Sequence, residues 1–329
     1  MANKEITSSL QNKALTQYPL VIEKTISTDE GILLKTEKNQ FYHLKRYSGA
    51  GEELKAALEA EDYLVEKGFS WSASHIPLVN GEVSLKHNNQ EYYLKKWQPE
   101  KLELPNKWQL QLGCELLAEI HKLGEGFKTD SNDSWTWPDW IKIFEMARDT
   151  IYELHTAVIK EQRKKLTKYF DRTAPKAFKD IEKAIVQLKR AGYYEQREEA
   201  IKTGYISLSQ VPTPSLGMNF DLIELLVPDL PACGLGAYLG QSCHWQQEKV
   251  LNKVVELLEV YDQKFRLFNE EIEVVKGFLE FPWEFWWVTE QHFLKSEKRD
   301  KKRNKKYAKA LKKIYKYSNG EIMSALNEL

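Results

Sequence analysis

A few carboxylate, hydroxyl and lysine side chains carry the chemistry that this sequence offers. Residues 204–229 read GYISLSQVPTPSLGMNFDLIELLVPD, and in a chain that is 29% charged this stretch has only Asp221, Glu224 and Asp229 as charged residues. Mg²⁺ prefers hard oxygen ligands, so these three carboxylates are the candidates for a metal site. Ser209 offers a hydroxyl in the same stretch, but a hydroxyl is a poor base at neutral pH.

A lysine and a glutamate in the first part of the chain form a second candidate group. Lys45 lies in FYHLKRY, which alternates like a strand. Glu61 follows on a helical face shared with Leu54 and Leu58, which would bury it, and Glu59 is the alternative by position. A strand lysine that reaches nucleotide phosphates, with a glutamate from the next helix, would suit phosphoryl transfer. The alternatives are an ordinary exposed lysine, or a pair that only ties the strand to the helix. The turn before this region is STDEG rather than a GxGxxG loop, which disfavours tight ATP binding.

Short alternating segments and one helix account for most of the first hundred residues. GILLKTEKN and QFYHLKRY predict a hairpin that turns at Lys38-Asn39, and EVSLK and QEYYLKKW predict a second one that turns at Asn88-Asn89. Between them, EELKAALEAEDYLVEKGF predicts a helix that ends at Gly68. The order strand, strand, helix, strand, strand predicts a small antiparallel β lobe over residues 1–98.

Helical patterns dominate after this point. Asn106 can cap the segment NKWQLQLGCELLAEIHKLG, which has a helical apolar stripe and ends at Gly124. Most of the remaining chain also has helical periodicity, except for residues 204–229. We therefore expect a larger, mainly helical lobe over residues 99–329, with the boundary near Gln98–Pro105.

The composition narrows the functional classes. Lys plus Arg and Asp plus Glu both number 48, so the overall charge gives no indication of a nucleic-acid partner. Three Cys without a CxxC motif fit a reducing compartment and predict neither a disulfide framework nor a metal site. The first residues lack an export signal, and no apolar run is long enough for a transmembrane span. The basic stretch 295–316 is either a contact surface or a solvated helix face.

Several local motifs, in their order and spacing, resemble a known family. GILLKTEKNQFYHLKRY, YLVEKGF and YYLKKW look like the small lobe of CotS-type spore coat proteins, which are relatives of aminoglycoside phosphotransferases and choline kinases. GCELLAEIHKLGEGF resembles that family's LAxxHxxxxGF helix, and FPWEFWWVTEQHF resembles its C-terminal signature. The resemblance covers about residues 20–315. It implies an α+β, two-lobed protein-kinase-like (aminoglycoside phosphotransferase-like) fold, with a small antiparallel β lobe and a large helical lobe. It also makes His121 a hydrogen-bonded core residue of the large lobe.

The resemblance implies a catalytic loop whose functional residues have been replaced. The family's loop resembles GFCHGDxxxxN, and alignment with GYISLSQVPTPSL puts Ser207 at the His, Ser209 at the catalytic Asp and Pro214 at the metal-binding Asn. Pro214 has no side-chain oxygen for a metal. The replacement does not depend on the alignment, because the sequence has no His within 156–243 and no Asp within 181–220.

The family's magnesium aspartate lies in a downstream hydrophobic-D-F-D motif. Alignment with FDLIELL puts Leu222 at this position and Glu224 at the second acid, whereas a shift of one residue would bring Asp221 there. On the nucleotide side, the resemblance makes Lys45 and Glu61 the remnants of a phosphate-contacting pair.

The sequence thus predicts a spore-coat-associated, kinase-like protein that is a catalytically dead pseudokinase with a structural or binding role. We expect no cofactor, no metal and no nucleic-acid partner. We expect other spore coat proteins as partners, with 295–316 as a contact surface. By resemblance, the protein is made in the mother-cell cytoplasm and deposited on the spore coat. The alternatives are a small-molecule phosphotransferase that uses ATP and Mg²⁺ at a rearranged site with Asp221 and Glu224, or a regulatory pseudokinase that binds nucleotide.

Overall fold

Two compact units make up the chain, and each is assembled from more than one segment. The computed structural model describes residues 2–28, 31–49, 51–72, 74–97, 106–129, 135–159, 165–209, 222–246, 251–294 and 307–312. Unit 1 consists of Met1–Gln109, Glu119–Trp137 and Thr203–Pro228, and unit 2 consists of Leu110–Ala118, Pro138–Lys202 and Asp229–Leu329. The predicted lobe boundary near Gln98–Pro105 lies outside the described residues and stays a prediction.

Unit 1 is built around an antiparallel sheet in the order β1-β2-β3-β6-β4, with β5 paired to β6. Its strands are β1 (Ile22–Ser27), β2 (Gly31–Thr36), β3 (Phe41–Arg46), β4 (His75–Ile76), β5 (Leu85–His87) and β6 (Gln90–Lys96). Both predicted hairpins are confirmed. Asn39, Asn88 and Asn89 have positive φ values of 58°, 48° and 58°, and asparagine tolerates this left-handed region well.

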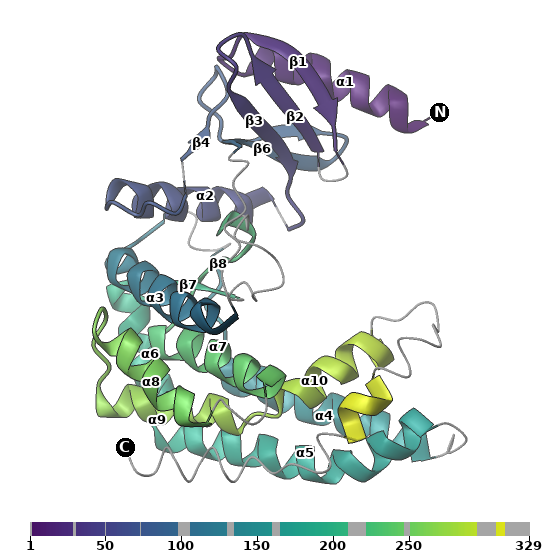
Figure 1. The fold of residues 1–329 in the computed structure, drawn as a ribbon, viewed down its shortest axis with the longest axis vertical. Coiled ribbons are helices and arrows are strands. Elements are labelled where there is room, and N and C mark those ends of the chain that lie inside the picture. The colour runs from purple at the N-terminus through teal and green to yellow at the C-terminus, as the bar shows by residue number, and fades with distance from the viewer. Residues whose placement is uncertain are drawn as a thin grey trace. The chain divides into compact units, whose positions relative to one another are not determined.

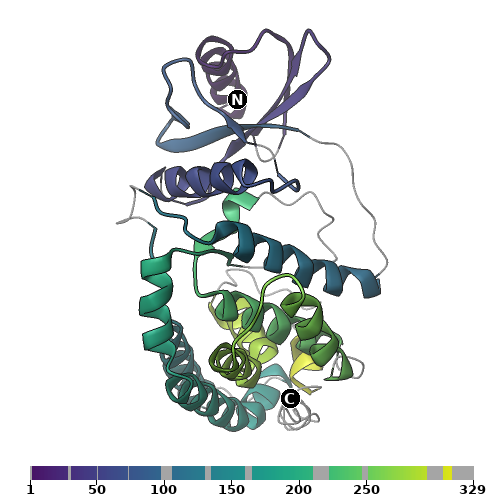
Figure 2. The ribbon, with the colours of Figure 1, turned by 90° about the vertical axis from the view of Figure 1, so that its left-hand side faces the viewer.

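Helices lie on both faces of this sheet (Figures 1 and 2). On one face, α1 (Ala2–Gln17) places Leu10 and Ala14 in an apolar cluster with Leu34, Leu44 and Leu94 of the sheet. The sequence analysis did not anticipate α1. On the other face lies α2 (Gly51–Glu66), the predicted helix, and Gly68 follows it with a φ of 98°.

Residues from the middle of the chain complete unit 1. They form β7 (Ile206–Leu208), the 3₁₀ turn η2 (Leu222–Glu224) and β8 (Leu226–Pro228), with β7 paired antiparallel to β8. Gly204 enters β7 with a φ of 85°, and a Cβ atom there would lie 2.1 Å from the carbonyl oxygen of Phe127. Glycine is therefore required for this close approach.

Unit 2 is helical, as predicted. It contains the middle of α3 (Asn106–Gly124) together with α4 (Trp140–Ile159), α5 (Lys165–Arg190), α6 (Tyr193–Thr203), α7 (Pro231–Gln246), α8 (Leu251–Asp262), α9 (Asn269–Glu280), α10 (Trp283–Thr289) and the π-helical turn η3 (Glu290–Leu294). Helix α4 packs on α5, α5 on α9, and α9 on α7. Rings of Phe144 and Phe281 stack at 4.1 Å in this core. Among the described helices, none has the length and apolar character needed to cross a membrane.

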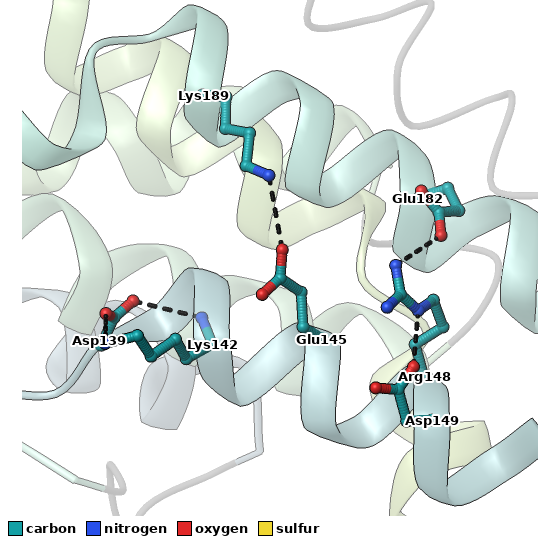
Figure 3. A network of polar contacts seen from close by, with 7 residues as sticks. All are labelled: Asp139, Lys142, Glu145, Arg148, Asp149, Glu182 and Lys189. Carbon is teal, nitrogen blue, oxygen red and sulfur yellow. Dashed lines mark hydrogen bonds and ion pairs between the residues drawn. The ribbon is translucent and has the colours of Figure 1, made fainter.

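Charged side chains also link α4 to α5 at the surface (Figure 3). Arg148 Nη1 lies 2.8 Å from Glu182 Oε1, and Lys189 Nζ lies 3.3 Å from Glu145 Oε1. All four side chains are at least 32% exposed, so water screens both pairs. The network is consistent with a solvated helix surface.

Candidate functional site

The segment that the resemblance assigns to the catalytic loop begins at β7, where Ser207 is fully buried. Ser207 pairs with Val227 across the β7–β8 ladder, and its Oγ lies 2.9 Å from Nε2 of His121. Burial lowers the pKa of His121 to about 3, so its imidazole is neutral at physiological pH. The expectation that His121 is a hydrogen-bonded buried residue is confirmed, although the structure assigns it to unit 1 rather than to the helical unit.

The next position of the loop, Ser209, is exposed. Its backbone N–H donates to the carbonyl oxygen of Leu225 at 2.7 Å, which continues the pairing of β7 with β8. Pro214 and Asp221 lie outside the described residues. The structure therefore places Ser207 and Ser209 next to each other at the end of β7 and leaves the remaining loop positions as predictions.

Apolar side chains occupy the described part of the segment assigned to the magnesium motif. Leu222 and Ile223 are each 1% exposed, and Leu226 is 5% exposed. The elements that carry them, η2 and β8, contact α2 within unit 1. A leucine thus lies buried at the position that the resemblance assigns to the magnesium aspartate.

Glu224, the candidate second acid, contacts the loop that follows β3. Ser48 Oγ donates a hydrogen bond to Glu224 Oε2 at 2.6 Å. The neighbouring Tyr47 has its pKa raised to about 12, first by burial and then by the negative charges of Glu53 and Glu224. The contact joins two chain segments that are 176 residues apart in the sequence.

Glu61 is completely buried, as predicted, but the structure gives it partners that the sequence analysis missed. Lys95 Nζ and Ser72 Oγ each donate to Glu61 Oε1 at 2.5 Å, and Lys95 Nζ also donates to Ser72 Oγ at 2.9 Å. Lys45 lies on β3 opposite Tyr93 of β6, and His43 lies opposite Lys95. Because paired residues share a face, Lys45 and Lys95 project from the same side of the sheet. The alternation in QEYYLKKW was the signal that would have made Lys95 a second candidate.

Asp229, the third candidate carboxylate, belongs to unit 2. Its oxygens accept hydrogen bonds of 2.8 Å from Trp140 Nε1 and from the backbone N–H of Leu230. The side chain is almost entirely buried, and burial raises its pKa to about 7. Trp140 begins α4 and Asp229 lies two residues before α7, so this carboxylate links the starts of two helices.

Two further expectations concern metal ligands and the basic stretch. Within the described part of the chain, no group of three or more His, Cys, Asp or Glu side chains is arranged around a common metal position. Of the stretch 295–316, only residues 307–312 are described. Tyr307 and Leu311 are buried there, and Tyr307 has ring contacts with Trp287 and His292. The proposed contact surface is otherwise outside the described residues.

Comparisons with known proteins agree with this architecture. The family described as "Spore coat putative kinase YutH" matches residues 11–328. An aminoglycoside phosphotransferase from Alicyclobacillus acidocaldarius superposes with a TM-score of 0.74 at 15% identity, covering 96% of both chains. A spectinomycin phosphotransferase, in complex with ADP and spectinomycin, gives a TM-score of 0.63 at 10% identity and covers 98% of both chains. An amicoumacin kinase gives 0.59 at 13% identity, covering 96% of this chain and 95% of the other.

At these identities the solved structures establish the fold alone, which is that of aminoglycoside phosphotransferase-like kinases. A search of the curated proteins gave no match. The family match is a match of the sequence itself, and it extends over residues 11–328. The chain belongs to the YutH family of kinase-like spore coat proteins.

Proposed function

We propose that the protein is a pseudokinase of the spore coat, which has kept the kinase fold and serves as a structural or binding component without transferring phosphate. It is synthesised in the mother-cell cytoplasm and takes its place in the coat through contacts with other coat proteins. The family match supports the association with the coat. The residues of unit 1 support the loss of catalysis.

The observation that carries the proposal is the burial of Ser207 against a neutral histidine. Phosphoryl transfer needs an aspartate that positions or deprotonates the acceptor, and magnesium that neutralises the phosphates. Ser207 is the first residue of the loop that would supply them, and its hydroxyl is engaged with His121 in a fully buried environment. At the position assigned to the catalytic aspartate, Ser209 offers only a hydroxyl, which is a poor base. At the position assigned to the magnesium aspartate, Leu222 is buried, and an aspartate without a metal there would cost several kcal/mol.

The described donor set also does not fit magnesium. Leu222 has no oxygen to offer, Glu224 accepts from Ser48, and both oxygens of Asp229 accept from protein N–H groups in unit 2. Magnesium requires several hard oxygens in near-octahedral geometry. The described residues therefore do not support a catalytic step with ATP and magnesium.

One observation favours a second candidate, a regulatory pseudokinase that binds nucleotide without turnover. Lys45 is on the same face of the sheet as Lys95, and that face is covered by α2. A lysine on this face suits contact with phosphate groups. An active phosphotransferase with a rearranged metal site is the less favoured alternative, because Leu222 and Leu226 are buried where polar ligands would be needed.

Calorimetric titration of the full-length protein with ATP, in the presence and absence of Mg²⁺, tests the proposal. We expect no heat of binding up to millimolar nucleotide and no phosphate transfer to hydroxyl-bearing acceptors such as aminoglycosides. Magnesium-dependent binding that is lost in Lys45→Ala, but kept in the matched sheet variant Lys35→Ala, together with phosphate transfer, would overturn it. Binding without transfer would select the nucleotide-binding pseudokinase instead.

A further inference from the structure

Helix α2 is attached to unit 1 by polar side chains on two of its sides. Toward the sheet, Glu61 is held by Lys95 and Ser72, and the next residue, Asp62, has Oδ2 3.1 Å from Nδ1 of His75. This second contact is a close approach of the two side chains and not a hydrogen bond. His75 and Lys95 are direct neighbours in the β4–β6 ladder. Two consecutive acids of α2 thus meet two adjacent strand residues.

A different side of α2 contacts the segment that follows α3. Tyr63 donates a hydrogen bond of 2.9 Å to the carbonyl oxygen of Glu125, and its ring packs edge-on against Phe127 at 5.4 Å. One turn earlier on the helix, Glu59 accepts a hydrogen bond from the buried hydroxyl of Thr129. The helix is therefore anchored by side chains of this chain both to the sheet and to residues 125–129.

The contact between Glu61 and Lys95 is the strongest of these anchors on physical grounds. The Glu61 side chain is 0% exposed and that of Lys95 is 14% exposed. A buried carboxylate must have an opposite charge at hydrogen-bond distance, and removal of that charge is strongly destabilising. Because Lys95 is part of the chain, this charge is present whether or not any ligand is bound.

We propose that Lys95 is the positioning residue that fixes α2 against the sheet, so that the placement of α2 within unit 1 does not depend on a nucleotide. A ligand shifts a conformational equilibrium only through its different affinities for the two states. With α2 already held by Lys95, Ser72 and the 125–129 segment, a nucleotide has no ordering of α2 left to supply. The kinase-like unit is then a fixed platform rather than a ligand-dependent switch.

Hydrogen exchange of the α2 amides, followed by mass spectrometry on the full-length protein, tests this proposal. Lys95→Met should accelerate exchange in α2 by about tenfold or more and lower Tm by several degrees, because Glu61 loses a buried counter-charge at hydrogen-bond distance. Lys95→Arg should restore most of the protection. The matched control is Lys35→Met, since Lys35 pairs with Glu23 in the same sheet but both side chains are partly exposed, at 27% and 51%. Lys35→Met should leave the hydrogen exchange of α2 unchanged.

A double-substitution cycle separates a real pair from a general loss of stability. Glu61→Gln with Lys95→Met should be more stable than Lys95→Met alone, because neither buried charge remains. If the single variant does not fold, the double variant decides: a folded protein whose α2 amides exchange faster than in the wild type supports the proposal. A double variant that keeps the wild-type protection of α2, or that also fails to fold, overturns it.

Three other results would contradict the proposal. They are unchanged α2 exchange in Lys95→Met, an equal acceleration in Lys45→Met, and slower α2 exchange in the wild type when ATP and Mg²⁺ are added. None of these measures phosphate transfer. Failure of this inference is thereby distinguishable from failure of the proposed loss of catalysis.

Discussion

His121 in unit 1 and Asp229 in unit 2 are buried titratable side chains that respond to the same cause in opposite ways. Both accept or share hydrogen bonds with neutral partners, Ser207 for His121 and Trp140 for Asp229. Burial disfavours the charged form in each case, so the pKa of His121 falls to about 3 and that of Asp229 rises to about 7. The difference shows that each unit carries its own pH dependence, with opposite sign.

The sign follows from proton linkage. Below pH 6.5 an unfolded histidine binds a proton that native His121 does not, so the stability of unit 1 falls as the pH falls toward 3. Between pH 3.8 and about 7, native Asp229 holds a proton that the unfolded chain has released. The stability contributed to unit 2 is therefore greatest below pH 3.8 and is lost as the pH rises through 7. Acid weakens one region and strengthens the other.

The largest expected effect comes from removing the acid in unit 2. Asp229→Asn should abolish a change of about 4 kcal/mol in the free energy of unfolding between pH 4 and pH 8. This change corresponds to the rise of the pKa of Asp229 to about 7. The measurement is the hydrogen exchange of α4 and α7 at pH 5 and pH 8, corrected for the intrinsic rate. In the wild type the protection should be lower at pH 8, and in the variant it should be nearly constant.

Asp149→Asn is the matched control for this substitution. Asp149 is an exposed carboxylate of α4 that pairs with Arg148, with 64% of its side chain exposed. Asp149→Asn should leave the pH dependence of hydrogen exchange in α4 and α7 as in the wild type. A wild-type unit 2 whose protection increases from pH 5 to pH 8 would contradict the assignment to Asp229.

A smaller effect of opposite sign is expected in unit 1. His121→Gln keeps a hydrogen-bonding group next to Ser207, but the glutamine cannot take up a proton. The variant should therefore not show the decrease of about 2 kcal/mol in the free energy of unfolding that we expect for the wild type on acidification to pH 5. The readout is the exchange of β7 and β8 at pH 5 against pH 7.5. The control is His155→Gln, a substitution on α4 in unit 2. If it changes the pH dependence of exchange in β7 and β8 as much as His121→Gln does, the assignment to His121 is wrong.

The smallest effect belongs to the exposed network in Figure 3. Lys189→Met removes the pairing with Glu145, in which the side chains are 53% and 37% exposed. Exposed pairs contribute about 0–1 kcal/mol, and salt screens them. We expect a change in Tm of no more than about 2 °C that disappears in 0.5 M salt. A decrease in Tm as large as that expected for Lys95→Met would show that burial does not determine the strength of these ion pairs.

Local features of the fold were predictable because single residues determine them. Asn39 and the Asn88-Asn89 pair specify their turns through positive φ, and Gly68 specifies the end of α2. Helix α1 was missed because, among its described side chains, the buried ones are Leu10 and Ala14, with Tyr18 just after the helix, and this pattern is too sparse to indicate a helix.

The candidate site was less predictable because strand register and distant segments define it. Glu61 was placed correctly as a buried residue of α2, but sequence spacing could not indicate that Lys95, 34 residues later, would reach it. No sequence pattern indicated that Ser72 would contact Glu61. The contact between Ser48 and Glu224 brings together residues whose separation is set by the whole of α3 to α6, which no local pattern encodes.

The composition of unit 1 has a consequence for how the protein is made. Its sheet and α2 come from the beginning of the chain, while β7, η2 and β8 come from Thr203–Pro228. Chains fold progressively as they leave the ribosome, N-terminal parts first. The side chains of α2 that meet η2 and β8 must therefore wait until residues 138–202 of unit 2 have also emerged. During translation, the side of α2 that meets η2 and β8 therefore stays accessible to chaperones longer than the side that meets the sheet.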